Sequence, residues 1–289
     1  MNWTYGLQNA IDYIEANITD ELSYDEIAMQ SGFSSFYFQR VFSILCGCSL
    51  GEYIRFRRLT LAGEALMKGD IKVIDAALKY GYESPESFSR AFTKFHGVTP
   101  SEVKKGGCSL NSFSRLSVEI ILKGGSVMNY KIVKKKAFQV LEKVSTQSIE
   151  DSENLNTIPD FWTQVKSDGT MKTLLELTND KSLIFGICYG NIPADSKTFD
   201  YSIAASVDKL SAVPQGFRVT EIPERTWIVF ECCGAMPEAI QTLWHKICSE
   251  FFSTSQYEPT YELDIEAYTA GDMSSPDYKS QIWIPIKEI

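Results

Sequence analysis

The chain has 289 residues, of which 44% are hydrophobic and 22% charged, and it is long enough for two ordinary globular domains. No run approaches the roughly 18 apolar residues of a membrane span, and the N-terminus MNWTYGLQNA lacks a charged-then-apolar leader, so we expect a cytoplasmic protein without a membrane partner. Seven cysteines without C-x-x-C spacing and only two histidines indicate reduced thiols, no metal site and no cofactor.

The net charge of -9 is unevenly distributed along the chain. Residues 1–39 carry six acids and no Lys or Arg, whereas residues 40–105 carry eleven bases and seven acids. From residue 106 onward acids again outnumber bases, with 24 against 17. Acidic flanks around a basic segment weaken non-specific phosphate binding and favour binding to a particular DNA site.

The first fifty residues predict three helices. The first covers residues 3–18, and the second begins at Ser23, which has the S-x-x-E spacing of a capping box with Glu26. Gly32 then allows a tight turn into a third helix within SGFSSFYFQRVFSILCG, residues 31–47. This order is typical of a helix-turn-helix unit.

The third helix has two unlike faces. Apolar side chains recur at i, i+3, i+4 and i+7 on the face that we expect to pack inward: Phe38, Val41, Phe42 and Leu45. The outer face carries Phe36, Gln39, Arg40 and Ser43. Glutamine and arginine are well shaped to read adenine and guanine in a major groove. The outer face is therefore either solvated, as on most amphipathic helices, or directed at DNA.

The same pattern recurs fifty residues later. The inner face repeats as Phe88, Ala91, Phe92 and Phe95, and the outer face repeats as Glu86, Ser89, Arg90 and Thr93. Ser84 and Pro85 predict the start of this helix, and a final short helix follows Thr99. The repetition favours two helix-turn-helix units in tandem.

A long helix over residues 50–67 separates the two units and is predicted to be a rigid spacer. Arg55, Arg57 and Arg58 lie near its start. They either contact DNA phosphates or form a solvated charge run.

Residues 5–105 resemble the DNA-binding domain of the AraC/XylS family of transcription regulators, through GFSSFYFQRVFSILCGCSLGEYIRFRR and GYESPESFSRAFTKFHGVTP. The resemblance implies two helix-turn-helix units on one long helix, a promoter or operator in double-stranded DNA as partner, and RNA polymerase as a candidate partner. It assigns base-reading roles to these residues: Phe36, Gln39, Arg40, Glu86, Ser89 and Arg90. Close relatives carry amides where Pro85 and Glu86 stand, and a carboxylate repels phosphates, so we expect the first helix to contribute more specificity.

The second half changes periodicity after a predicted linker over residues 108–127. Eight β-type runs are predicted at 129–133, 138–144, 183–189, 199–207, 217–222, 226–232, 261–268 and 281–286, with helices near 158–165 and 237–252. Trp162 and Trp244 mark the two helices at an offset of 82 residues, and the same offset relates Tyr201 to Trp283. We therefore predict a multi-domain chain: an all-α DNA-binding domain (1–107), the linker, and an α+β domain (128–289) of two strand-strand-helix-strand-strand repeats.

Glu266 is the candidate ligand-binding residue of the second half. Alternation in TYELDIEAYT places it on one strand face with Glu262, Asp264 and Tyr268. That face is either wet or forms the floor of an aromatic groove between the repeats, where a carboxylate without a protein cation would favour a cationic ligand. Aromatic side chains that either line such a groove or pack in the core are Trp162, Tyr189, Tyr201, Trp227, Tyr268 and Trp283.

Residues 128–287 resemble the GyrI-like effector-binding domains of multidrug-sensing regulators, through FDYSIAASV, RTWIVFECCG, LDIEAYT and QIWIPI. The resemblance implies that Glu266 faces a cavity that takes cationic or amphipathic compounds. Together the two halves predict a one-component transcription regulator that senses a small organic effector and is not an enzyme. Two alternatives stay open: a hydrolase with Glu266 as general base, and an architectural DNA-binding protein without an effector response.

Overall fold

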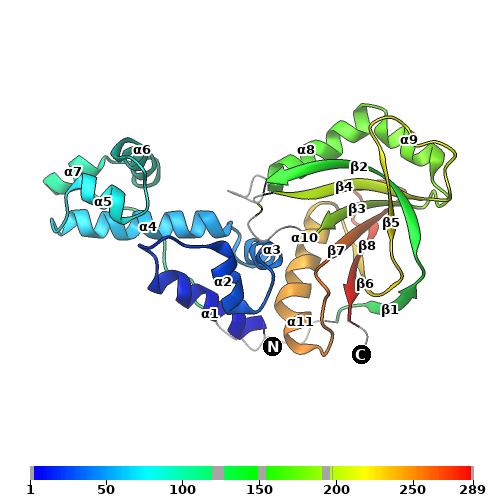
Figure 1. The fold of residues 1–289 in the computed structure, drawn as a ribbon, viewed down its shortest axis with the longest axis horizontal. Coiled ribbons are helices and arrows are strands. Elements are labelled where there is room, and N and C mark those ends of the chain that lie inside the picture. The colour runs from blue at the N-terminus through cyan, green and yellow to red at the C-terminus, as the bar shows by residue number, and fades with distance from the viewer. Residues whose placement is uncertain (1–2, 119–126, 149–153, 191–195, 197, 288–289) are drawn as a thin grey trace. The chain divides into compact units, whose positions relative to one another are not determined.

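The fold is that of a computed structural model, which describes residues 3–118, 127–148, 154–190, 196 and 198–287 (Figure 1). The chain forms two compact units, the first built mainly from Met1–Phe42 and Cys48–Ile121 and the second from Leu122–Ile289. Residues 119–126 of the predicted linker lie outside the described residues. Among the described residues, no helix is both long and apolar enough to cross a membrane.

The first unit is all helical, as predicted. Its helices are α1 (Trp3–Ala16), α2 (Tyr24–Ser31), α3 (Ser35–Cys46), α4 (Leu50–Met67), α5 (Val73–Lys79), α6 (Pro85–His96) and α7 (Pro100–Lys105). The predicted inner faces are confirmed, because Phe38 and Phe42 of α3 and Phe88 and Phe92 of α6 are all fully buried. Pairs α2–α3 and α5–α6 form the two helix-turn-helix units on the long helix α4.

Side-chain caps begin three of these helices. Ser49 with Glu52, and Thr99 with Glu102, form capping boxes, and Ser84 accepts a hydrogen bond from the Ser87 amide. The capping box predicted for Ser23 is wrong, because the Ser23 side chain caps no amide. The carboxylate of its intended partner, Glu26, instead accepts a hydrogen bond from the Tyr13 hydroxyl at 3.1 Å.

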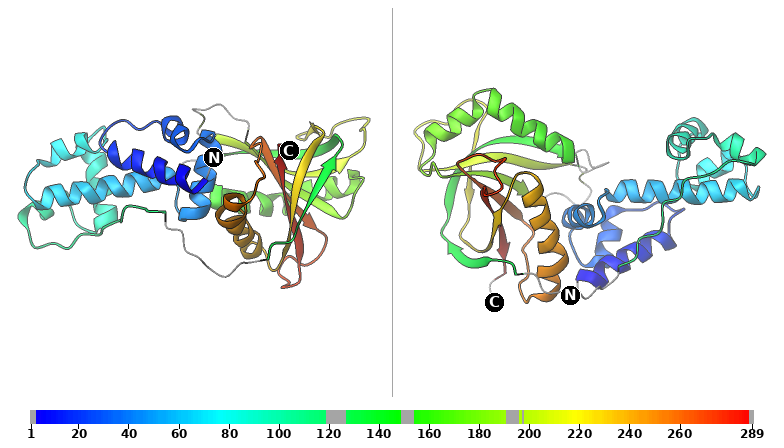
Figure 2. Two further views of the ribbon diagram at one scale, coloured as in Figure 1. Left: turned by 90° about the horizontal axis from the view of Figure 1, so that it is seen from below. Right: turned by 180° about the vertical axis from the view of Figure 1, so that it is seen from behind.

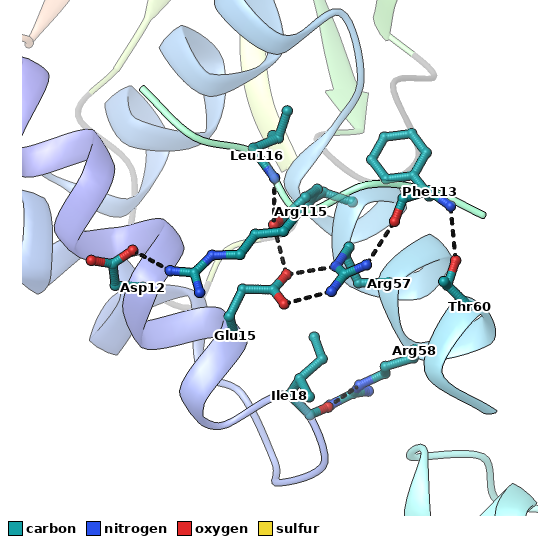
Figure 3. Close-up of polar contacts among 10 residues, drawn as sticks. Asp12, Glu15, Ile18, Arg57, Arg58, Thr60, Phe113, Arg115 and Leu116 are labelled. Atoms are coloured by element: carbon teal, nitrogen blue, oxygen red, sulfur yellow. Dashed lines mark hydrogen bonds and ion pairs between the residues drawn. The ribbon is translucent and has the colours of Figure 1, made fainter. Parts of the chain in front are cut away.

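Residues 111–118, which we call the strap, bind along the first unit after α7 (Figure 3). The Phe113 amide donates to Thr60 Oγ1 at 2.9 Å, and its carbonyl accepts from Arg57 at 2.7 Å. The Val118 amide donates to the side chain of Gln8 in α1 at 2.8 Å. This part of the predicted linker is therefore fixed to the DNA-binding unit by backbone hydrogen bonds.

A buried ion pair joins α1, α4 and the strap (Figure 3). Arg57 donates to both carboxylate oxygens of Glu15, at 2.8 and 2.9 Å, and the two side chains are only 12% and 9% exposed. Arg58 donates to the carbonyl oxygens of Ile18 and Asp20. The option that Arg57 contacts phosphates is therefore wrong in this fold, because its guanidinium is neutralised by Glu15 inside the unit. A contact between Arg58 and phosphate stays a prediction.

The pKa of Glu15 reflects two opposing effects. Burial raises this pKa. Hydrogen bonds from Arg57 and Tyr53, together with the charge of Arg57, lower it by a larger amount, so the net pKa lies below the ordinary 4.5. The charged form of Glu15 is thus favoured in the folded state. Its contribution to stability is present above the unfolded pKa and is lost as pH falls through the folded pKa.

The second unit is a strongly curled antiparallel sheet with helices on one face (Figure 2). Its strands are β1 (Tyr130–Lys135), β2 (Phe138–Ser148), β3 (Leu183–Tyr189), β4 (Thr198–Val207), β5 (Arg218–Ile222), β6 (Arg225–Cys233), β7 (Leu263–Thr269) and β8 (Lys279–Ile286). Its helices are α8 (Asn154–Ser167), α9 (Thr170–Leu177), α10 (Glu238–Lys246), the π-helical turn η2 (Ile247–Phe251) and α11 (Phe252–Thr254). The predicted strands and the two predicted helices are confirmed, whereas α9 was not predicted.

The two repeats exchange their first strands. The first repeat contains β1 to β4 and the second contains β5 to β8, and the sheet order is β1-β6-β8-β7-β3-β4-β2-β5. Strand β1 therefore pairs with β6 of the second repeat, and β5 pairs with β2 of the first. The central pair β3–β7 joins the repeats. The sequence repeat of strand-strand-helix-strand-strand is therefore correct, but the repeats form one sheet.

The two faces of this sheet have different neighbours. One face carries an apolar cluster that includes Leu263, Ile265 and Ala267 of β7. Because strand side chains alternate, Glu266 and Tyr268 point to the opposite face. That face is covered by helices, since Trp244 of α10 bonds Glu266 and Trp162 of α8 bonds Tyr201.

We predict that Glu15→Gln lowers the free energy of unfolding of the first unit by about 3 kcal/mol at neutral pH, because it leaves the buried Arg57 charge without a carboxylate. Urea unfolding followed by far-ultraviolet circular dichroism measures this loss. The difference from wild type should shrink as pH falls below 4.5, because the wild-type carboxyl then becomes protonated.

The matched control is Asp12→Asn, which removes the partner of Arg115 in an ion pair whose side chains are 50% and 51% exposed. This change should cost well under 1 kcal/mol. Equal losses in the two variants would contradict a special role for the Glu15 pair.

Candidate DNA-reading helices and effector site

The outer face of α6 is open to solvent. Glu86 and Arg90 are exposed, and Thr93 is half-buried. Ser89 is also half-buried, and its hydroxyl donates to the Pro85 carbonyl at 2.7 Å. The second predicted reading helix therefore presents a carboxylate and a guanidinium outward.

Helix α3 carries the first set of predicted reading residues. Arg40 and Ser43 are half-buried, but Phe36 and Gln39 are each only 6% exposed. The Gln39 amide donates to Ser35 Oγ one turn earlier, and removal of the Phe36 ring from water is favourable. The base-reading roles of Phe36, Gln39 and Arg40 stay predictions. Arg55 of α4 is half-buried, with its guanidinium 5.4 Å from the Phe56 ring centre.

Glu266 lies in the middle of the sheet of the second unit. It pairs with Gly186 of β3 on one side and with Ile282 of β8 on the other. Its side chain is half-buried beneath the helices. The carboxylate is thus held by rigid strands at the junction of the two repeats.

Two neutral groups satisfy this carboxylate. Trp244 Nε1 donates to one oxygen at 2.7 Å, and the Tyr268 hydroxyl donates to the other at 2.8 Å. Within the described parts of the chain, no Lys, Arg or His forms an ion pair with Glu266. Its negative charge is therefore hydrogen-bonded but not neutralised.

Aromatic rings surround the carboxylate. The Trp162 ring meets the Tyr268 ring edge-to-face with centres 5.0 Å apart, and Trp162 Nε1 donates to the Tyr201 hydroxyl at 3.0 Å. We call Glu266, Trp162, Tyr201, Tyr268 and Trp244 the aromatic site. Trp244 was missed as a site residue, although its offset of 82 from Trp162 was the signal that could have found it.

The pKa of Tyr268 is raised well above its ordinary value, first by burial and then by the charge of Glu266. The hydroxyl therefore stays protonated at physiological pH. It remains a hydrogen-bond donor to the carboxylate and adds no second negative charge to the site.

Three predicted site residues lie elsewhere. Trp227 and Trp283 belong to the apolar cluster on the opposite face of the sheet, and Tyr189 packs against that cluster. The Tyr189 hydroxyl donates to the buried carboxylate of Glu142 at 2.6 Å. Their assignment to the same groove as Glu266 is wrong. The offset of 82 fits the helices but not the strands, and a shift of one residue moves a strand side chain to the other face.

Gly186 makes room for the aromatic site. A Cβ atom at this position would overlap the Tyr201 hydroxyl and lie 3.1 Å from Tyr201 Cζ and 3.4 Å from Trp162 Cζ2. The absence of a side chain opposite Glu266 is therefore what lets these two rings approach the strand.

No group of three or more His, Cys, Asp or Glu side chains that could hold a metal ion occurs in the described ranges. None of the seven cysteines forms a disulfide. The chemistry that the aromatic site offers is therefore one carboxylate, two neutral donors and the faces of aromatic rings.

We predict that Gly186→Ala destabilises the second unit by about 1 to 3 kcal/mol, because the Tyr201 and Trp162 rings must shift. Thermal unfolding and tryptophan fluorescence measure the effect. Adding Tyr201→Phe removes the overlapping oxygen and should restore part of the loss. If the double variant is the sum of two losses, the overlap is not the cause.

Comparison with known proteins extends these findings to each half of the chain. Residues 131–286 match the family described as integron-associated effector binding protein, and residues 27–106 match a helix-turn-helix domain family. The HTH-type transcriptional activator AarP of Providencia stuartii is 39% identical over 108 residues, which is 37% of this chain and 80% of AarP. The regulatory protein SoxS of Escherichia coli K12 is 38% identical over 98 residues, or 34% of this chain and 92% of SoxS.

A solved structure is similar to the second half. It is that of SAV2435 bound to tetraphenylphosphonium, with a TM-score of 0.49 and 23% sequence identity, covering 55% of this chain and 94% of that chain. The family matches and the curated relatives lead to one assignment. The chain belongs to the AraC-type helix-turn-helix regulators through its N-terminal half and to the integron-associated, GyrI-like effector-binding family through its C-terminal half, and is a DNA-binding transcription regulator with a ligand-binding domain.

Proposed function

We propose that the ligand of the C-terminal unit is an organic cation with an apolar or aromatic body, bound at Glu266. The observation that carries this proposal is the charge of the site: a carboxylate under aromatic rings that, among the described residues, is hydrogen-bonded to the neutral groups of Trp244 and Tyr268 and to no cation. A cation supplies the neutralising charge that the chain does not. Ring faces add cation–π attraction, about 2 kcal/mol where water is excluded.

Binding requires a rearrangement of the rings. Trp162 packs against Tyr268 and bonds Tyr201, so its ring covers two of the rings on which an aromatic ligand would pack. Trp162 lies on α8, whereas Tyr201, Tyr268 and Glu266 lie on strands of the sheet. We infer that a ligand enters by displacing the Trp162 ring, because a helix side chain moves more easily than paired strands.

On the DNA-binding side, we propose that α3 and α6 enter successive major grooves, about 34 Å apart, so that one chain recognises an asymmetric site. Arg90 on the exposed face of α6 is suited to bidentate contact with guanine, and Arg40 holds the equivalent position on α3. RNA polymerase as a partner stays a prediction.

We predict that tetraphenylphosphonium binds the full chain, whereas tetraphenylborate, which has nearly the same shape and a negative charge, binds at least tenfold more weakly. Tryptophan fluorescence titration measures both, since Trp162 and Trp244 lie in the aromatic site. Glu266→Gln should weaken binding of the cation at least tenfold and bring the affinities for the two ions closer together.

Glu142→Gln is the matched control, because Glu142 is a buried carboxylate on the opposite face of the same sheet. It should leave the preference for the cation in place. Equal affinity for the two ions, or no effect of Glu266→Gln, would show that charge at Glu266 does not select the ligand.

We predict that Arg90→Ala costs about 1 to 3 kcal/mol at the preferred DNA site and relaxes the preference at one base position. Arg40→Ala should do the same at a different position. Fluorescence anisotropy with a set of single-base operator variants measures this at fixed salt concentration. Lys94→Ala, which removes an exposed charge near the end of α6, should weaken all sequences equally. The same uniform loss for Arg90→Ala would make Arg90 a phosphate contact.

A further inference from the structure

A cleft lies between the two helix-turn-helix units of the first unit. It has a volume of about 630 Å³ and is lined by the loop after α1, one side of α4 and the turn between α5 and α6. Its apolar wall includes Leu22, Ile54 and Leu78, and its polar groups include Arg58 and Tyr82. This volume falls in the range of small-molecule sites.

The guanidinium of Arg58 brings a charge to this cleft without a carboxylate partner. Its hydrogen bonds go to the carbonyl oxygens of Ile18 and Asp20, at 2.8 and 2.7 Å. No carboxylate in the described residues forms an ion pair with it. Burial lowers the pKa of Arg58, which is the sign of a partly desolvated cation.

Tyr82 places an unsatisfied hydroxyl in the same cleft. Its oxygen is buried and has no hydrogen-bond partner among the described residues. Its ring is fixed edge-to-face against Phe88, with centres 5.3 Å apart. A buried hydroxyl without a partner is rare in native proteins, and an acceptor atom from a ligand would satisfy it.

Two glycines shape the cleft. A Cβ atom on Gly81 would lie 2.5 Å from Arg58 Nη1, and one on Gly51 would lie 2.7 Å from the Tyr24 hydroxyl. Both residues line the cleft. The Arg58 guanidinium and the Tyr24 hydroxyl can occupy these positions because neither glycine carries a side chain.

We propose that this cleft binds a small organic carboxylate with an apolar body. The carboxylate accepts hydrogen bonds from Arg58 and, after a shift of the turn at Gly81 that uncovers the buried oxygen, from the Tyr82 hydroxyl. The apolar body packs on Leu22, Ile54 and Leu78. Asp20 and Glu21 also line the cleft, so a single negative charge is favoured over two. A ligand here contacts the loop after α1, helix α4 and the turn before α6 at once, and therefore affects the spacing of the two DNA-reading helices.

The test titrates the full chain with 2-naphthoate and, in parallel, with 2-naphthamide, its neutral counterpart, by isothermal titration calorimetry. We expect naphthoate to bind at one site and the amide to bind at least tenfold more weakly. Tyr82→Phe removes only the hydroxyl and should weaken naphthoate about tenfold.

A pair of variants at Leu78 that are matched in size and differ in charge avoids any change to the buried groups. Leu78 is 64% exposed, so substitution there does not disturb the core. Both Leu78→Glu and Leu78→Gln remove an apolar contact to the ligand, but only Leu78→Glu adds a negative charge to the cleft wall, so it should weaken naphthoate binding at least fivefold more than Leu78→Gln does.

The cation site of the second unit is tested separately. Glu266→Gln should leave naphthoate binding unchanged, and Tyr82→Phe should leave tetraphenylphosphonium binding unchanged. The proposal is overturned if the amide binds as well as naphthoate, if Leu78→Glu and Leu78→Gln behave alike, or if Tyr82→Phe affects only DNA binding.

Discussion

The pairing of Gly186 with Glu266 across β3 and β7 is the contact on which the second unit depends. It joins the two repeats into one sheet and fixes the register of the strands on either side. It also places a residue without a side chain opposite the only carboxylate of the aromatic site, so that the Tyr201 and Trp162 rings can close over that strand. A register shift of one residue would turn Glu266 into the apolar cluster on the other face, at a high cost in desolvation.

The first unit is organised by a different constraint, the use of α4 arginines inside the fold. Arg57 is neutralised by Glu15, whereas Arg58 is held by two carbonyl oxygens. In the described part of each unit, a partly buried charge is hydrogen-bonded without an ion-pair partner: the carboxylate of Glu266 and the guanidinium of Arg58. Such groups are less stable than ion pairs and are often found where a ligand completes the site.

The sequence predicted most of the fold because its signals were local. The bounds of α4 were correct because a capping residue, Ser49, stands directly before it, and glycines stop α2 and α6 with left-handed backbone. The Ser23 capping box does not form, and the Glu26 carboxylate instead bonds Tyr13 of another helix. A partner from a distant segment leaves no local signal.

The aromatic site was predicted only in part, for a related reason. Alternation within β7 correctly grouped Glu266 with Tyr268, since both lie on one strand. Assigning Trp227 and Trp283 to the same groove required the register between strands, which hydrogen bonds across the whole sheet determine. Likewise, the burial of Arg57 could not be predicted from α4 alone, because its partners lie in α1 and the strap.

The exchange of β1 and β5 between the repeats has a consequence for how such a domain could arise. Each half, taken alone, would leave its own three remaining strands with an open edge, which a β-strand from another molecule could extend. Two identical halves would complete each other by lending their first strands, as in a strand-swapped homodimer. Fusion of such a dimer into one polypeptide would give the present arrangement. Once fused, the two copies can diverge, so a glutamate at the position of Glu266 is needed in only one of them.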